Sequence, residues 1–257
     1  MAKNNKHTER MAKSDRNVNR AMILLMVGLI AEFYLLMVNN YFVKGAVGQV
    51  LTMMTVLKVL GIAGAALFGA GLVLWFMRKK WTRFAPAAPW LLSIGFFFAV
   101  SSQLMLKIYP QGTTVMCVLV PVAMLLGIVF LLYPREFSLQ ALALTAAMMA
   151  MYLIHRGGGS DTWRGLVIGC SVFAALVIAA LAVAVSKAGK NGGKLEKLGD
   201  LRIVSDDGNY KLIYAVLGVC VAAIVIALFA TSIAYYGLWI LAVGTFLLAV
   251  YYTVKMM

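Results

Sequence analysis

Long apolar runs separated by short polar connectors dominate the pattern of this chain. The runs are close to the ~20 residues that a helix needs to cross the ~30 Å hydrocarbon layer of a membrane. They are continuous rather than alternating and are rich in Ala, Leu, Met and Gly, which favours helices over the strands of a barrel. The pattern predicts an all-α, polytopic transmembrane helical bundle of about eight spans, at residues 21–42, 50–77, 88–106, 113–133, 137–155, 164–186, 211–233 and 237–254.

The last two spans come from one apolar stretch that is too long for a single crossing. Tyr235, Tyr236 and Gly237 offer a place to turn inside it, because tyrosines favour the membrane interface and glycine permits a tight bend. We therefore expect the chain to reverse at these residues. Without that turn the chain would cross seven times, and its C-terminus would lie on the other side.

Lysine and arginine collect on alternate connectors. Six lie in residues 1–20, four in the connector after the second span, one at Arg135, six between residues 187 and 211, and one at Lys255. These make 18 of the 23 in the chain, whereas the intervening connectors hold four. Under the positive-inside rule this distribution places both termini in the cytoplasm.

The same reading divides the chain into a tail and a membrane domain. Residues 1–20 are polar and basic and are predicted to form a disordered cytoplasmic tail. The tail repeats Met1-Ala2-Lys3 as Met11-Ala12-Lys13, which leaves both methionines open as the first residue. Residues 21–257 are predicted to form a single transmembrane domain, with a cytoplasmic loop at 187–210.

Composition supports the membrane class and restricts the partners. The chain is 63% hydrophobic and 12% charged, which is outside the range of ordinary soluble domains. Its net charge of +14 lies beside the spans rather than in a basic domain of its own. We therefore expect anionic lipid headgroups at the cytoplasmic face as its counterpart, and no nucleic acid. The expected location is the cell membrane (plasma or inner membrane).

Small residues and one proline indicate how the helices pack. Gly61, Ala65 and Gly69 recur every four residues in the second span, and Gly165 and Gly169 do so in the sixth. Small residues at this spacing let two helix backbones approach closely, either within the chain or in a homo-oligomer. A proline in the middle of the fourth span is predicted to kink that helix and to free a carbonyl near residue 117; it is Pro121.

Two charges lie where charges are costly, and they form the candidate intramembrane polar site. Glu32 is near the middle of the first span, and Lys58 is in the second. A charge at the bilayer centre costs roughly 2.5–3.5 kcal/mol on insertion scales, so Glu32 must be paired, protonated or in contact with water. Counted from the hairpin near residues 45–46, Lys58 lies at a similar depth and could pair with it; counted from Arg78, it lies near the outer interface.

No motif assigns a reaction to this chain. Cys117, Cys170 and Cys220 lie singly in three spans without metal or redox spacing, and we predict no catalytic residue, metal or cofactor. This leaves three classes of function open. The first is a non-enzymatic accessory or assembly subunit with a protein partner or as a homo-oligomer. The second is a transporter or channel for a small solute, proton-linked through Glu32. The third is a lipid-modifying membrane enzyme.

Overall fold

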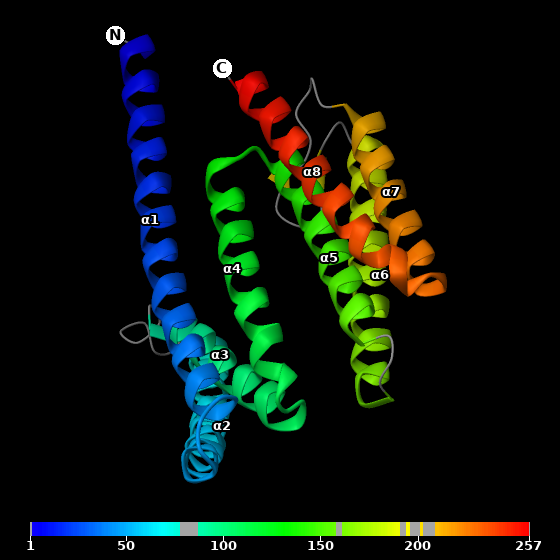
Figure 1. Ribbon diagram of the computed structural model, residues 1–257. Helices are drawn as coiled ribbons and strands as arrows, with labels where there is room; N and C mark the ends of the chain where they lie inside the picture. Colours follow the sequence, from blue (N-terminus) through cyan, green and yellow to red (C-terminus); the bar gives the residue numbers. More distant parts are fainter. Residues whose placement is uncertain are drawn as a thin grey trace. The chain divides into compact units, whose positions relative to one another are not determined.

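Eight helices make up nearly all of the described chain (Figure 1). The computed structural model describes residues 2–77, 87–157, 161–190, 194–195, 201–202 and 209–256, with side chains at 15–77, 87–157, 164–189 and 209–256. All eight helices are long and apolar enough to cross a membrane. They are α1 (Ala2–Phe42), α2 (Val47–Phe76), α3 (Ala88–Lys107), α4 (Gln111–Leu132), α5 (Arg135–Gly157), α6 (Asp161–Lys190), α7 (Tyr210–Phe229) and α8 (Thr231–Met256).

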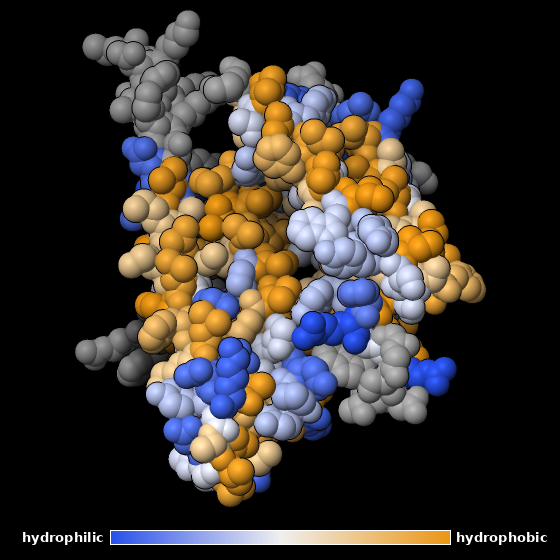
Figure 2. Space-filling view, viewed as in Figure 1, coloured by the Kyte–Doolittle hydropathy of each residue, from blue (hydrophilic) through white to orange (hydrophobic). Residues whose placement is uncertain are grey.

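Hydrophobic side chains cover the outside of these helices. Phe33, Ile62 and Phe173 are 72%, 73% and 67% exposed, and hydrophobic residues occupy much of the face drawn in Figure 2. Exposure on this scale would be unfavourable in water, but it suits a hydrocarbon solvent. The chain is therefore a multi-pass helical membrane protein, and the predicted fold class is confirmed.

The first helix begins much earlier than the apolar pattern predicts. Residues 2–20, expected to be disordered, continue α1 as helix, so this prediction was wrong for them. The segment contains six lysines and arginines, which are good helix formers, beside four asparagines, which are poorer ones. Extending a helix that has already formed avoids the cost of nucleation, which explains how a polar segment joined to a span becomes helical.

The turn between the last two spans lies at Ala230, and the predicted turn at Tyr235, Tyr236 and Gly237 was wrong. Ala230 has φ −133° and ψ 83°, outside the helical region, and it ends α7. At the start of α8, the N–H of Ile233 donates to the carbonyl of Ala230. A Thr and a Ser follow Ala230 directly, and residues of this type favour helix starts. The expected number of spans, eight, is confirmed.

The long connector 187–210 is only partly described. α6 extends into it as far as Lys190, and two short strands pair antiparallel within it. They are β1 (Lys194–Leu195) and β2 (Leu201–Arg202). Residues 191–193, 196–200 and 203–208 of this connector, and the basic residues 78–83 of the connector after α2, lie outside the described residues.

The helices form two compact units. Unit one contains Met1–Met26 and Val122–Met257, and unit two contains Val27–Pro121. In unit one, α5 packs against α6, α7 and α8, and 61% of its apolar stretch is buried, against 11 to 28% in the other helices. In unit two, α2 and α3 pack closely as a pair. The unit two core consists of Leu35, Val38, Phe42, Leu57, Met105 and Met116.

Candidate functional site

Glu32 lies on α1 within unit two, where it is partly buried. Its carboxyl group is hydrogen-bonded to the side chain of Cys117 on α4. When Glu32 is ionised the thiol must be the donor, because a carboxylate only accepts. The oxygen Oε2 of Glu32 is buried and has no hydrogen-bond partner among the described residues. The site thus leaves one oxygen unsatisfied at a depth where an uncompensated charge is costly.

Lys58, the other half of the predicted polar site, does not pair with Glu32. The preceding residue, Leu57, is fully buried in the unit two core. Successive residues on a helix differ by about 100° in direction, so Lys58 points away from that core and is exposed. No ion pair joins the two side chains in the part of the chain that the structure describes. The structure gives Glu32 a neighbour that charge-based reasoning did not consider, the thiol of Cys117.

Pro121 adds a further polar group at the same place. α4 continues through this proline from Gln111 to Leu132. Because proline has no N–H, the carbonyl of Cys117, four residues earlier, loses its usual helical donor. Cys117 therefore carries both the thiol that meets Glu32 and a carbonyl that can accept another hydrogen bond. The predicted kink at Pro121 stays a prediction.

The close contact between α2 and α3 depends on glycines. A methyl group added at Gly64 would lie 2.6 Å from the main-chain nitrogen of Ala99, and one at Gly71 would lie 2.9 Å from that of Leu92. From the other side, a methyl group at Gly95 would collide with the main chain of α2. Such distances are too short for packed carbon and nitrogen atoms, so the helices reach this separation only because these positions lack side chains.

The predicted helix-packing residues divide into two groups. Gly61 is buried against α3, on the same face as the glycine contacts just described. Ala65 is exposed, and a methyl group at Gly69 would meet nothing within 4 Å, so the contact face differs from the predicted four-residue series. Gly165 and Gly169 on α6 are exposed as well, and each has open space where a side chain would begin.

Reasoning from the sequence missed a second buried carboxylate, Glu136. It lies in the first turn of α5, is 4% exposed, and places Oε2 3.9 Å from Nζ of Lys255 near the end of α8. One helical turn further, Gln140 donates from Nε2 to the hydroxyl of Tyr252 over 3.1 Å. The other amide atom of Gln140, Oε1, is buried without a partner among the described residues. These contacts fasten the end of α8 to the start of α5.

Residues just after α4 and at the start of α5 make further contacts with the end of α8. The hydroxyl of Tyr133 lies 3.1 Å from Oγ1 of Thr253, and the ring of Phe137 lies 5.4 Å from that of Tyr252, centre to centre. The sequence does contain a signal for this arrangement. A proline directly before Arg135 and an acidic residue directly after it are typical of a helix start. The predicted start at residue 137 left Glu136 in a connector.

The remaining polar groups do not form a reactive centre in the described chain. The three cysteines form no disulfide, and no group of three or more His, Cys, Asp and Glu could hold a metal ion among these residues. A cavity of about 190 Å³ between α6 and α7 is lined by Ser171, whose hydroxyl is buried without a partner in this part of the structure. Tyr34 and Ser102 in unit two also have buried hydroxyls without a hydrogen-bond partner among the described residues.

Comparisons of this chain with protein-family models, with curated proteins and with solved structures found no match. The class that the fold defines is a polytopic α-helical membrane protein. Its function must be argued from its own residues.

Proposed function

We propose that the protein is a non-enzymatic accessory or assembly subunit of the cell membrane, with both termini in the cytoplasm. The observation that carries the proposal is the exposed glycine pair on α6, Gly165 and Gly169. The opposite face of this helix already packs inside unit one, through residues such as Ala174 and Ile178. Small residues four apart allow another helix to approach closely, and no helix of this chain uses this pair in the described residues.

Charge placement supports the proposed orientation and a lipid partner. The connectors that hold 18 of the 23 lysines and arginines alternate with connectors that hold four. Each cation near an anionic membrane surface contributes about 1 kcal/mol of attraction. We therefore assign the basic connectors to the cytoplasmic face, in contact with anionic headgroups. Most of these cations lie outside the residues whose side chains the structure describes.

The assembly role is tested by placing large side chains on the exposed glycine face of α6. The double variant Gly165→Leu/Gly169→Leu should lose the partner protein or second copy that wild type retains after gentle detergent extraction. Gly218→Leu on α7 is the matched control, because this glycine is also exposed with open space around it. The measurement is light scattering with mass spectrometry of the purified complex. A wild-type protein that is monomeric and carries no other protein would contradict the proposal.

Proton-linked transport of a small solute is the second candidate, and the unpartnered Oε2 of Glu32 favours it. A carboxyl group within a span that can take up and release a proton is a typical feature of transport pathways. In liposomes under a proton gradient, Glu32→Gln should abolish solute flux, whereas Lys58→Gln, which alters an exposed side chain, should leave it intact. Full flux in Glu32→Gln, or no flux in wild type, would remove this candidate.

A further inference from the structure

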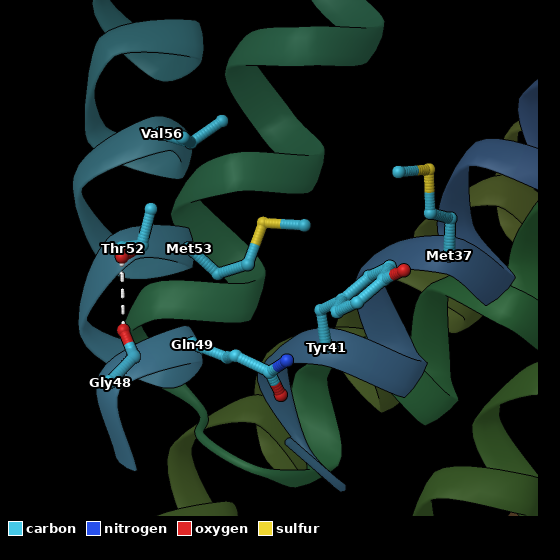
Figure 3. Close-up of a pocket in the computed structure, with 7 residues that line it drawn as sticks. All are labelled: Met37, Tyr41, Gly48, Gln49, Thr52, Met53 and Val56. Carbon is cyan, nitrogen blue, oxygen red and sulfur yellow. Dashed lines mark hydrogen bonds between the residues drawn. The ribbon is translucent and has the colours of Figure 1, made fainter. Parts of the chain in front are cut away.

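A groove between α1 and α2 opens on the surface of unit two (Figure 3). Its volume is about 420 Å³, within the roughly 300–1,000 Å³ of typical small-ligand sites. It begins beside the turn that joins the two helices and extends along both of them. The residues that line it are Met37, Tyr41, Gly48, Gln49, Thr52, Met53 and Val56.

The lining of the groove is almost entirely apolar, and polar side chains lie near the turn. Tyr41 and Gln49 lie beside the turn, whereas Met37 and Val56 lie further along their helices. The side-chain oxygen of Gln49 accepts from the N–H of Ala46 over 3.1 Å, which leaves its amide nitrogen with hydrogen atoms to donate. That nitrogen is turned toward Tyr41 in Figure 3. Methionines suit a flexible apolar occupant, because their own side chains are adaptable.

The end of unit two that contains the turn is positively charged. Lys44 lies in the turn itself and is exposed. Lys107 ends α3 at the same end of the unit, since the rings of Phe42 and Tyr109 meet there at 4.8 Å between centres. No acidic residue occurs in the sequence between Glu32 and Glu136 to neutralise this end.

We propose that this groove binds one acyl chain of an anionic phospholipid, with the lipid phosphate beside the turn. The apolar length accepts the chain, and the amide of Gln49 and the ammonium of Lys44 are donors suited to phosphate oxygens. A second copy of the protein is a poorer occupant, because it would bring its own Lys44 and Lys107 toward the same cations. Under the proposed orientation this lipid belongs to the outer leaflet, opposite the basic connectors.

The test measures which lipids stay with the full-length protein. Wild type is reconstituted in bilayers of equal phosphatidylglycerol and phosphatidylcholine, extracted again, and examined by native mass spectrometry. It should retain a phosphatidylglycerol molecule. Gly48→Trp fills the groove at a position with open space around it, and it should reduce retention several-fold. Gly69→Trp is the matched control on the same helix, because it also has open space but does not line the groove.

A second pair of measurements separates the headgroup from the chain. Lys44→Gln/Lys107→Gln should keep a bound lipid, and the extra lipid that it retains over Gly48→Trp should shift toward equal amounts of the two headgroups, because lipid held at the basic connectors is common to both variants. If Gly48→Trp does not fold, Val56→Trp fills the groove from its other end. The proposal is overturned if the filled variants retain as much lipid as Gly69→Trp, or if the lysine variant keeps the full preference for phosphatidylglycerol. It is also overturned if Gly48→Trp converts a dimer to a monomer.

Discussion

The two units each bury a carboxylate, and they satisfy it differently. Glu136 in unit one lies in the first turn of α5, near the positive end of the helix, and has the ammonium of Lys255 at 3.9 Å. Glu32 in unit two lies in mid-helix, meets only the thiol of Cys117 in the described chain, and leaves Oε2 unpartnered. The first carboxylate is placed where its charge stabilises the fold. The second is placed where an ionised carboxylate would oppose the fold.

The units also differ in what holds their helices together. Unit two brings α2 and α3 into backbone contact through glycines such as Gly64 and Gly95. Unit one surrounds α5 with three helices and adds polar contacts at its start, including the bond from Gln140 to Tyr252. Stability in unit two therefore depends on the close fit of α2 against α3. In unit one the carboxylate is part of the structural framework.

The largest expected effect on stability comes from disrupting the glycine contact between α2 and α3 in unit two. Gly64→Leu places a side chain where even a methyl group would lie 2.6 Å from the main chain of α3. We expect a loss of about 3 kcal/mol in the free energy of unfolding, the upper part of the range for overpacked sites. Denaturant unfolding in detergent micelles, followed by circular dichroism, measures it. Gly69→Leu on the same helix should change stability little, and equal losses in both variants would refute the glycine contact.

A smaller loss in the free energy of unfolding is expected when unit one loses the carboxylate of Glu136. Glu136→Ala should cost about 1–2 kcal/mol, because a buried acceptor and its attraction to Lys255 disappear. The effect stays moderate because the Lys255 side chain is 35% exposed and can be solvated. A double-mutant cycle with Lys255→Met isolates the energy of the pair. Independent, additive losses in that cycle would show that the two side chains do not interact.

The smallest effect is expected at the carboxylate of unit two. Glu32→Gln replaces a carboxyl group that has no cationic partner among the described residues, and it keeps the shape of the side chain. Stability should change by less than about 1 kcal/mol, or rise slightly, because the neutral amide is less costly to bury. The same unfolding assay compares it directly with Glu136→Gln, which should be the less stable of the two. The reverse order would mean that Glu32, rather than Glu136, is the structural carboxylate.

The helices could be predicted from the sequence because a membrane demands long apolar runs, and these are visible without any knowledge of contacts. The exact turn at Ala230 is marked only by the Thr and Ser that follow it, whereas the nearby tyrosines and glycine are the stronger turn signals. The Glu32 neighbour was missed for a related reason. Charge complementarity pointed to Lys58, but the direction of each side chain around its helix decides contact, and Leu57 occupies the inward position.

The glycine contact was only partly predictable. Spacing identifies small residues but not which face of a helix meets a neighbour, so Gly61 was found together with Ala65 and Gly69, which face elsewhere. The cluster around Glu136 joins residues more than a hundred positions apart, from the start of α5 to the end of α8. Long-range pairs of this kind leave no periodic trace in a sequence, although the proline before Arg135 marked one end of the cluster.

The length of α1 has a mechanical consequence. Its 41 residues measure about 60 Å along the helix axis at ~1.5 Å per residue, roughly twice the ~30 Å thickness of the hydrocarbon layer. Part of this helix must therefore extend beyond the hydrocarbon layer as a rigid helical segment. A binding partner or fusion tag attached to its tip would be held tens of ångströms from the lipid surface, at a spacing that a flexible leader could not maintain.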